Sequence, residues 1–444
     1  MQRRGLPGAT PAVTTWLLGM TLLIGLAARV SADEPWLGPY SGPSRDDVDA
    51  STLDGKVLCG YQGWFNTPGD GWGSGFVHWG RGLESPDRRH FTVDLWPDVS
   101  EYAPEDLCDI PGLKMPDGSP ARLYSAFRKG PVLTHFRWMR EYGIDGVFLS
   151  RFAGEAADKN RARHVNQVLA NVREGCHREG RVWAMMLDLS VGRGLPTKAV
   201  MDDWKFLCDQ VRVREDSRYL RHQGKPVVLL WGLGFQDRPW TPEQGEELVR
   251  FFKEDTKYGG VYLIGGIDPH WRTLKGASRR DPAWSAIYRS FDAISPWDAG
   301  RYRDDASMDR LRKDVWEGDI AELKPLGKGY MPTAFPGFSW DNLMRKKRGT
   351  TRIPRREGEF FWRQFAIFRD LGVRTVFVGM FDEVDEGTAI YKVTNSPPVG
   401  PYFLTYEGMP PDWYLRLTGA ATRMIRGEIA ASPKIPADLR STLP

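Results

Sequence analysis

The stretch PVLTHFRWMREYGIDGVFLS, residues 131–150, contains the structural unit that decides the fold. Pro131 predicts the first turn of a helix, because the N–H that proline lacks would have no partner at that position. Gly143 predicts the end of this helix, and residues 145–150 then form a short apolar strand. The apolar residues that mark one face of the helix are Val132, Leu133, Phe136 and Met139.

The same order of helix, glycine and apolar strand recurs along the chain. Further helices are expected over 161–178, from a capping box at 241–244 to the glycines at 259–260, over 319–326 and over 360–371. The strands expected after them cover 182–188, 261–264, 330–335 and 375–379, and three more are expected at 57–61, 226–231 and 293–296.

These strands are continuous apolar runs, which is typical of parallel strands buried on both faces. Eight of them, separated mostly by helices, predict an α/β fold: a single (β/α)8 TIM-type barrel with long loops at the C-terminal face of the strands. A doubly wound open sheet is the structural alternative. It is disfavoured because no glycine-rich phosphate loop joins a strand to a helix.

The two ends of the chain differ in composition from the segment between them. Arg3 and Arg4 precede an apolar run at 16–28 and small residues at 30–32, which predicts a signal peptide over residues 1–32. We therefore expect a secreted or periplasmic protein. Residues 33–430 are expected to form one domain that ends with a helix at 412–426, and the proline-containing residues 431–444 are expected to be a disordered tail.

The charge balance argues against two classes of partner, nucleic acids and membranes. The 444-residue chain has 41% hydrophobic and 12% aromatic residues, which is enough for a large core. The formal net charge of +4 falls when residues 1–32 are removed, because that segment holds three arginines and no acid, and 58 basic residues then stand against 57 acidic ones. This balance predicts no nucleic-acid partner and no membrane association after signal cleavage.

The chain has four cysteines, Cys59, Cys108, Cys176 and Cys208. In an oxidising compartment this number allows one or two disulfides, and the spacing fits no zinc site. Cys59 lies in an apolar strand, where a buried free thiol is expected. Cys176 and Cys208 lie near the ends of successive helices and could meet, so both free and paired thiols stay open.

Aromatic and acidic side chains follow the strands at their carboxyl ends, where a barrel of this kind builds its active site. Sugars suit this combination, because their C–H faces stack on indole rings and their hydroxyls bond to carboxylates. The residues at these ends are Tyr61, Trp64, Arg151, Asp188, Trp231, Asp268, Trp297, Asp298, Trp340, Glu383 and Glu386.

Other candidates lie outside the strand ends. Trp72 and Trp79 lie in loops that contain glycine, and His78 beside Trp79 is a candidate hydroxyl-binding residue. His135 and His164 lie on predicted helices, so we expect them to face solvent. Arg151 is a candidate partner for the acids of the site.

Residues 380–388, MFDEVDEGT, place four carboxylates within five positions directly after the last strand. Such clusters are usually solvated surface acids. Here the segment continues an apolar strand and precedes Ile390, so the acids must bind a cation or hold one another at separated pKa values. Separated pKa values suit glycoside hydrolysis, in which one carboxylic acid protonates the leaving oxygen and another carboxylate has the opposite task. The cation alternative does not match the spacing of a calcium loop.

The stretch FDEVDEGTAI, residues 381–390, resembles the FNEWHEGTQI signature of glycoside hydrolase family 99, the endo-α-mannosidases. It is closer still to bacterial proteins described as family 71/99-like. The resemblance spans about residues 56–426 and implies that 33–430 is a glycoside-hydrolase-like catalytic domain. Other stretches that agree in order are GYQGWF (60–65), HW (78–79), GIDGVFLS (143–150), ISPW (294–297) and FPGFSW (335–340).

By position, the resemblance implies that Glu383 is the base that removes the proton from the sugar 2-hydroxyl. It implies that Glu386 is the acid that protonates the leaving oxygen and later activates water, with a 1,2-anhydro sugar intermediate and net retention. The implied substrate is an α-linked glycan of the α-mannan type. The substrate-binding residues that we expect are Tyr61, Trp64, His78, Trp79, Asp188, Trp231, Trp297, Trp340 and Asp382.

The segment departs from the family where Asn is Asp382 and where Trp-His is Val384-Asp385. Two other functions therefore stay open: a non-catalytic carbohydrate-binding protein on the same barrel and, from the family 71 side, an inverting α-glucanase. A third alternative is a Ca²⁺-like cation near Asp382 and Asp385, but we expect neither a metal nor a cofactor. The expected partner is an oligo- or polysaccharide, and we expect a monomer.

Overall fold

The strands of the barrel are short, parallel and almost entirely buried. In the computed structural model, which describes residues 34–81, 83, 91–190 and 195–441, they pair in the order β10-β9-β8-β7-β5-β4-β1-β12-β11. Burial on both faces is what the continuous apolar runs predict. The strand bounds are β1 Lys56–Tyr61, β4 Gly146–Phe152, β5 Val182–Asp188, β7 Lys225–Trp231, β8 Tyr262–Ile267, β9 Ala293–Pro296, β10 Gly329–Tyr330, β11 Thr333–Ala334 and β12 Thr375–Val378.

β10 and β11 are two halves of one strand, and together they close the ring. β10 pairs with β9 and β11 pairs with β12, while only Met331 and Pro332 separate the halves. Proline has no N–H to donate to a ladder, so the strand is interrupted there. Backbone bonds still reach both neighbours, because Met331 N donates to Ile294 O (2.9 Å) and Phe377 N donates to Pro332 O (3.0 Å). This confirms the (β/α)8 TIM-type barrel, with the strand predicted at 330–335 split in two.

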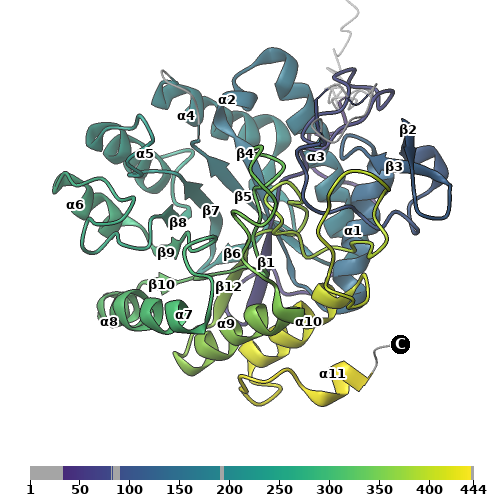
Figure 1. The fold of residues 1–444 in the computed structure, drawn as a ribbon. Coiled ribbons are helices and arrows are strands. Elements are labelled where there is room, and N and C mark those ends of the chain that lie inside the picture. The colour runs from purple at the N-terminus through teal and green to yellow at the C-terminus, as the bar shows by residue number, and fades with distance from the viewer. Residues whose placement is uncertain (1–33, 82, 84–90, 191–194, 442–444) are drawn as a thin grey trace, which may run out of the picture.

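Helices surround the strands, as Figure 1 shows. The predicted helix ends at Gly143 and Gly180 are confirmed, since both glycines adopt the left-handed conformation that closes a helix. The capping box of Thr241 and Gln244 is also confirmed, but its helix ends at Glu254, before the glycines at 259–260. The main helices are α1 Lys129–Tyr142, α3 Lys159–Glu179, α4 Thr197–Phe206, α5 Pro242–Glu254, α6 Ala283–Ser290, α7 Asp305–Leu311, α8 Glu317–Leu323, α9 Glu359–Asp370 and α10 Trp413–Arg426.

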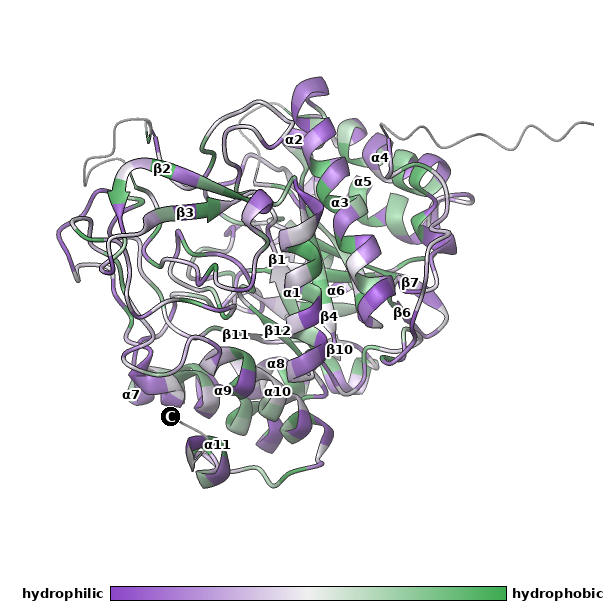
Figure 2. Ribbon diagram, turned by 90° about the vertical axis from the view of Figure 1, so that its right-hand side faces the viewer, coloured by the Kyte–Doolittle hydropathy of each residue, from purple (hydrophilic) through white to green (hydrophobic). Residues whose placement is uncertain are grey.

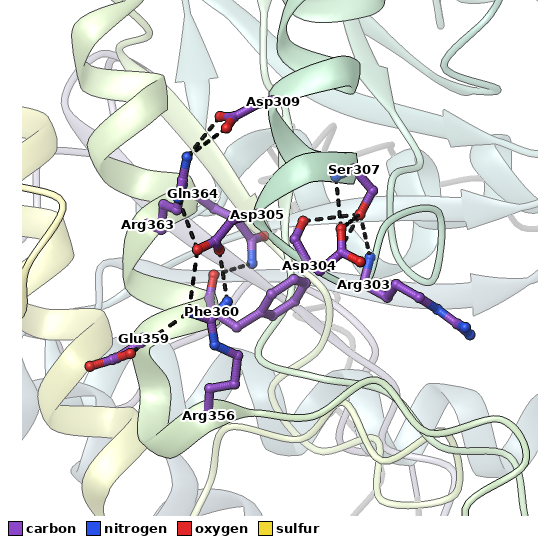
Figure 3. A network of polar contacts seen from close by, with 10 residues as sticks. All are labelled: Arg303, Asp304, Asp305, Ser307, Asp309, Arg356, Glu359, Phe360, Arg363 and Gln364. Atoms are coloured by element: carbon purple, nitrogen blue, oxygen red, sulfur yellow. Dashed lines mark hydrogen bonds and ion pairs between the residues drawn. The ribbon is translucent and has the colours of Figure 1, made fainter.

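Gln364 on α9 holds the broken strand from outside, and Figure 3 shows this side chain with its contact to Phe360. Its Nε2 donates to Phe335 O and Phe360 O, both at 2.9 Å. Its Oε1 accepts from Phe335 N at 2.9 Å and from the Tyr302 hydroxyl at 2.7 Å. The amide is buried and all four of its hydrogen-bonding positions are used. It therefore takes the place of a ladder partner just beyond β11.

Ion pairs beside Gln364 join α9 to α7, as Figure 3 also shows. Arg363 contacts Asp309 at 2.8 Å and Asp305 at 3.0 Å, and Arg356 contacts Asp305 at 2.7 Å. Each pair is partly exposed and contributes little alone. As a network they fix the position of the helix that carries Gln364.

The long connection between β1 and α1 contains a two-stranded antiparallel sheet, β2 Leu107–Lys114 and β3 Pro120–Tyr124. Figure 2 shows this hairpin among the loops on one side of the barrel, clear of the helices α4 and α5. The same figure shows apolar and polar positions side by side on the helices, as expected for elements buried on one face.

Asp94 joins three loops at the mouth of the barrel. Its N–H donates to Val384 O (2.8 Å), and its backbone carbonyl accepts from Leu404 N (2.7 Å). Its carboxylate accepts from Asp341 N (2.9 Å) and Asn342 N (3.0 Å). Burial raises the pKa of Asp94 to about 7. The acidic segment after β12 is therefore anchored to the loop that follows β1 and to the loop that follows Trp340.

The C-terminal residues dock on the barrel up to Ser441. Ile435 is buried, and α11 Ala437–Ser441 is a short helix. Ser432 O accepts from the Trp362 indole N–H at 2.9 Å, and Arg440 donates to Glu359 at 3.2 Å. The disordered tail expected from residue 431 is corrected for 431–441, because an apolar anchor and these bonds hold it against α9.

All four cysteines lie in the described part of the chain and are free thiols, with Cys59 and Cys176 buried. The pairing considered for Cys176 and Cys208 does not occur. The predicted signal peptide, residues 1–32, lies outside the described residues. Of the helices in the described ranges, none has the length and apolar character needed to cross a membrane.

Candidate active site

A cleft of about 850 Å³ opens at the carboxyl ends of the strands. This is where a (β/α)8 barrel builds its active site. The residues predicted for the site that line it follow β1, β5, β7, β9, β11 and β12, so the barrel brings together side chains from most of the chain. They are Trp64, Asp188, Trp231, Trp297, Trp340, Glu383 and Glu386.

Asp382 lies beneath the cleft and does not line it. Its two carboxylate oxygens accept from Gln62 N and Gly63 N, both at 2.8 Å. Burial raises its pKa to about 7. Because both oxygens are occupied by backbone N–H groups, we correct its assignment as a substrate-binding residue. Asp382 ties the loop after β1 to the segment after β12.

Glu383 lies in the cleft wall and is held by two side chains. Gln62 Nε2 donates to its Oε1 at 3.3 Å, and the Thr388 hydroxyl donates to its Oε2 at 3.4 Å. Burial, and then the negative charge of Glu386, raise the pKa of Glu383 well above its usual range. The carboxyl group is thus oriented, and burial beside a second acid favours its protonated form.

Glu386 is the second carboxyl group of the cleft. Its backbone carbonyl accepts from Ser339 N at 2.8 Å, which fixes it against the loop before Trp340. Burial, and then the neighbouring Asp385, raise the pKa of Glu386 to about 8. Glu383 and Glu386 therefore titrate as an interacting pair in which one group can keep a proton while the other releases it. Glycoside hydrolysis requires such a pair.

His78 does not line the cleft but supports a residue that does. Its ring stacks on Trp64, and its Nδ1 lies 3.3 Å from Asp385 Oδ2. Its backbone φ of 59° is left-handed, a conformation in which histidine is enriched. The hydroxyl-binding role predicted for His78 is therefore replaced by support for Trp64 and contact with buried Asp385.

Tyr61 and Trp79 are buried below the cleft, and we correct their assignment as substrate-binding residues. The Tyr61 hydroxyl lies 2.8 Å from His135 Nδ1, and His135 Nε2 lies 2.7 Å from the Tyr102 hydroxyl. His135 is buried rather than solvated, and burial lowers its pKa to about 3. The Trp79 indole N–H donates to Tyr124 O at 3.0 Å. The connection between β1 and α1 folds over these side chains and makes them core.

Three further side chains have structural partners away from the cleft. Arg151 contacts both carboxylate oxygens of Asp203 at 2.7 Å and Asn166 at 3.0 Å, instead of the acids of the site. The Trp72 ring packs 4.5 Å from the ring of His164, which is buried rather than solvated. Arg151 and Trp72 are therefore not part of the candidate site.

Two indoles form an apolar corner of the cleft. Trp231 and Trp297 meet edge to face, with ring centroids 5.5 Å apart and an interplanar angle of 82°. Asp188 lies at the end of β5, where its Oδ1 accepts from Ser190 N at 2.7 Å, and burial raises its pKa to about 6. An apolar corner beside a carboxyl group suits a sugar ring and its hydroxyls.

Several buried polar atoms of the cleft have no protein partner among the described residues. They include Gln62 Oε1 and the indole nitrogens of Trp64 and Trp231. Nearly all buried polar atoms in proteins are hydrogen-bonded, so unpaired ones in a cleft are available to a ligand.

Sequence reasoning missed seven polar residues of the cleft: Gln62, Ser190, Gln236, Asp237, Arg238, His270 and Arg301. Each lies one to seven residues beyond a strand-end residue that was named. A search further along each loop would have found them.

In the described part of the chain, no group of three or more His, Cys, Asp and Glu side chains is arranged to hold a metal ion. The expectation that the protein uses no metal or cofactor stays a prediction.

The fold defines the class: a (β/α)8 barrel with paired carboxyl groups after its last strand. Among solved structures, two of the GH99 endo-α-mannosidase from Bacteroides thetaiotaomicron, one of them in complex with bis-tris propane, are similar. Their TM-scores are 0.63 and 0.64 at 17% and 16% identity, covering 86% of this chain and 100% of theirs. A glycoside hydrolase-like protein has a TM-score of 0.52 at 15% identity, covering 86% of this chain and 97% of its own.

No family model matches the sequence, and no curated protein sequence matches it. At the identities given, the likeness to the solved structures is one of fold. This likeness confirms the fold that the resemblance at residues 381–390 implies.

Proposed function

We propose that the protein is an exported glycoside hydrolase that cleaves α-linked glycans of the α-mannan type. The observation that carries the proposal is that Glu383 and Glu386 line the same cleft, together with four tryptophans. The shared fold with an endo-α-mannosidase favours α-mannan as the glycan. Export rests on the signal-peptide pattern of residues 1–32.

In the proposed reaction Glu386 acts first as an acid and Glu383 as a base. Glu386 gives its proton to the glycosidic oxygen as the bond from C1 breaks. Glu383 takes the proton of the 2-hydroxyl, whose oxygen closes onto C1 to form a 1,2-anhydro sugar. Water then adds at C1, giving a proton to Glu386, while Glu383 returns its proton to O2 as the C1–O2 bond opens. The configuration at C1 is retained.

The surroundings of Glu386 support its role as the acid. A general acid must hold its proton near neutral pH, and the pKa of Glu386, about 8, allows it. Gln62 and Thr388 fix the direction of Glu383. His78 also brings an imidazole to Asp385, the position at which the resembled signature has histidine.

Release of reducing ends from α-mannan, α-glucan and plant-type glycans tests the proposal. We expect the unchanged protein to release reducing ends from α-mannan. Glu383→Gln and Glu386→Gln should lose this release while they still bind the glycan. The control Glu246→Gln, on the exposed face of α5, should release as much as the unchanged protein. NMR of the first product reports its anomeric configuration, and an inverted product contradicts the retaining mechanism.

A carbohydrate-binding protein is the second candidate, because Val384 and Asp385 replace the Trp-His of the signature and both are buried. It predicts that glycans raise the melting temperature while no reducing ends appear. That result would overturn the hydrolase proposal.

A further inference from the structure

Two guanidinium groups line the cleft away from the glutamate pair. Arg238 follows β7, which lies across the ring of strands from β12, and Arg301 follows β9. Their side chains are 26% and 41% exposed, so both are partly withdrawn from solvent. A partly desolvated cation attracts an opposite charge more strongly than a solvated one does.

Arg238 is held in place and has donors left for a ligand. Arg279 donates to the backbone carbonyls of Phe235 (3.3 Å) and Arg238, which fixes the loop. The Arg238 guanidinium lies over the ring of Trp231, 5.8 Å from its centroid, and pairs with Asp237 at 2.7 Å. Asp237 is 69% exposed at the rim. Arg238 Nε is buried and has no hydrogen-bond partner within the described ranges. Such an exposed pair contributes little and leaves the guanidinium free to bind.

Arg301 forms only a weak ion pair with its carboxylate partner. One of its nitrogens lies 3.5 Å from Asp268 Oδ2, the long end of an ion pair. Asp268 is buried and also accepts from His270 N at 2.9 Å and the Ser278 hydroxyl at 3.3 Å. A guanidinium has five N–H groups, so most of those of Arg301 remain for a ligand.

A basic loop beside the cleft is a second, independent feature that favours a negatively charged ligand. Residues 341–351 follow Trp340 and close back on it, since Trp340 N donates to the Thr351 hydroxyl at 2.7 Å. The loop carries Arg345, Lys346, Lys347 and Arg348, all exposed, and no ion pair to them occurs in the part of the chain that the structure describes. These four cations lie next to one another on a single loop beside Trp340.

We propose that the cleft takes an anionic glycan, whose carboxylate or sulfate groups are bound by Arg238 and Arg301. The inference rests on the proposed function in that a glycan occupies the cleft. Two parallel N–H groups of a guanidinium match the two oxygens of a carboxylate or sulfate, whereas a neutral sugar offers only single hydroxyls. Charged groups at the mouth also draw an anionic chain towards the cleft before it binds.

The test measures binding of short α-manno-oligosaccharides in three forms: neutral, oxidised to the carboxylate at C6, and sulfated at O6. Calorimetry uses the full chain with Glu386→Gln, so that turnover does not interfere. Arg238→Gln and Arg301→Gln are compared with Arg122→Gln, a control on β3 whose side chain is 40% exposed and paired with Asp109. Melting temperatures show that each variant folds.

We expect an anionic form to bind roughly tenfold or more tightly than the neutral form, with Arg238→Gln and Arg301→Gln each removing most of that gain and Arg122→Gln none of it. Added salt should weaken the anionic form alone. Preference for the carboxylate or for the sulfate identifies the group.

Equal binding of all three forms overturns the inference, as does an equal loss for all three in the arginine variants. The outcome is separate from that of the proposed function. If neutral mannan is hydrolysed and binding shows no preference for charge, the hydrolase proposal stands and the anionic-glycan inference fails. If the anionic forms bind through the arginines but no glycan is hydrolysed, the inference stands and the hydrolase proposal fails. If nothing binds, both fail.

Discussion

The imidazole of His78 lies flat on the indole of Trp64, with ring centroids 4.0 Å apart and an interplanar angle of 5°. The ring of Phe152 also stacks on Trp64, with its centroid 5.4 Å away, and the ring of Phe65 meets it edge to face at 6.3 Å. Trp64 is thus packed against three rings, and its position in the cleft depends on a histidine that itself lies outside the cleft.

Replacing His78 with asparagine should weaken glycan binding with little effect on stability. Asparagine tolerates the left-handed backbone at this position but removes the stacked ring. We expect roughly a threefold to tenfold loss of affinity, measured by calorimetry. His78→Phe keeps the ring, so its affinity should stay close to that of the unchanged protein. Equal losses in both variants would show that contact with Asp385, not stacking, sets the position of Trp64.

Asp385→Asn should move the alkaline limb of the pH–rate profile to lower pH. The negative charge of Asp385 helps to raise the pKa of Glu386 to about 8, and its removal lowers that pKa. A general acid must be protonated, so activity falls as pH rises through its pKa. We expect the limb to move by roughly one pH unit. Asp109→Asn, at an exposed carboxylate on β2, is the control, and an unmoved limb in Asp385→Asn would argue against Glu386 as the acid.

Trp79 and Trp297 should respond in opposite ways to alanine. Trp79 is buried and bonded to Tyr124, so Trp79→Ala should lower the free energy of unfolding by about 3–5 kcal/mol. Trp297 lines the cleft, so Trp297→Ala should mainly reduce glycan affinity, by roughly tenfold. Denaturant unfolding and calorimetry on the same two proteins check both statements. A binding loss in Trp79→Ala at temperatures where it is folded would restore its predicted sugar-binding role.

Gln364→Leu should destabilise the barrel by about 2–4 kcal/mol, because it leaves Phe335 N and O and the Tyr302 hydroxyl without partners. Denaturant unfolding measures the change. Gln167→Leu is the matched control, since Gln167 on α3 makes one side-chain bond, to Asn171 at 2.9 Å, and should cost under about 1 kcal/mol. Similar values for the two variants would mean that Gln364 does not hold the strand formed by β10 and β11.

The barrel could be predicted from the sequence because its signals are local. Gly143 and Gly180 end helices directly before continuous apolar runs, and each run is buried on both faces in the structure. The break at Pro332 has a local signal too, because a proline inside an apolar run cannot donate to the ladder, but residues 330–335 were predicted as one strand. Gln364 gave no signal, since its partners are fixed only when α9 packs against β11.

The candidate site was predicted in part for the same reason. Glu383 and Glu386 follow a strand end directly, so their place in the cleft depends on the barrel alone. Tyr61 and Trp79 were misassigned because their burial depends on contacts between distant segments. The His135 ring that meets the Tyr61 hydroxyl is 74 residues away in the chain. Patterns within a short window do not encode such contacts.

The interruption at Met331 and Pro332 also determines where this barrel opens first. In an unbroken ring several strand pairs must separate before the strand amides meet solvent, whereas β10 and β11 each form only a two-residue ladder. A local movement of α9 that withdraws Gln364 is enough to release Phe335 N to solvent. We therefore expect native-state hydrogen exchange of the ring to begin at β10 and β11, on the side that faces α9.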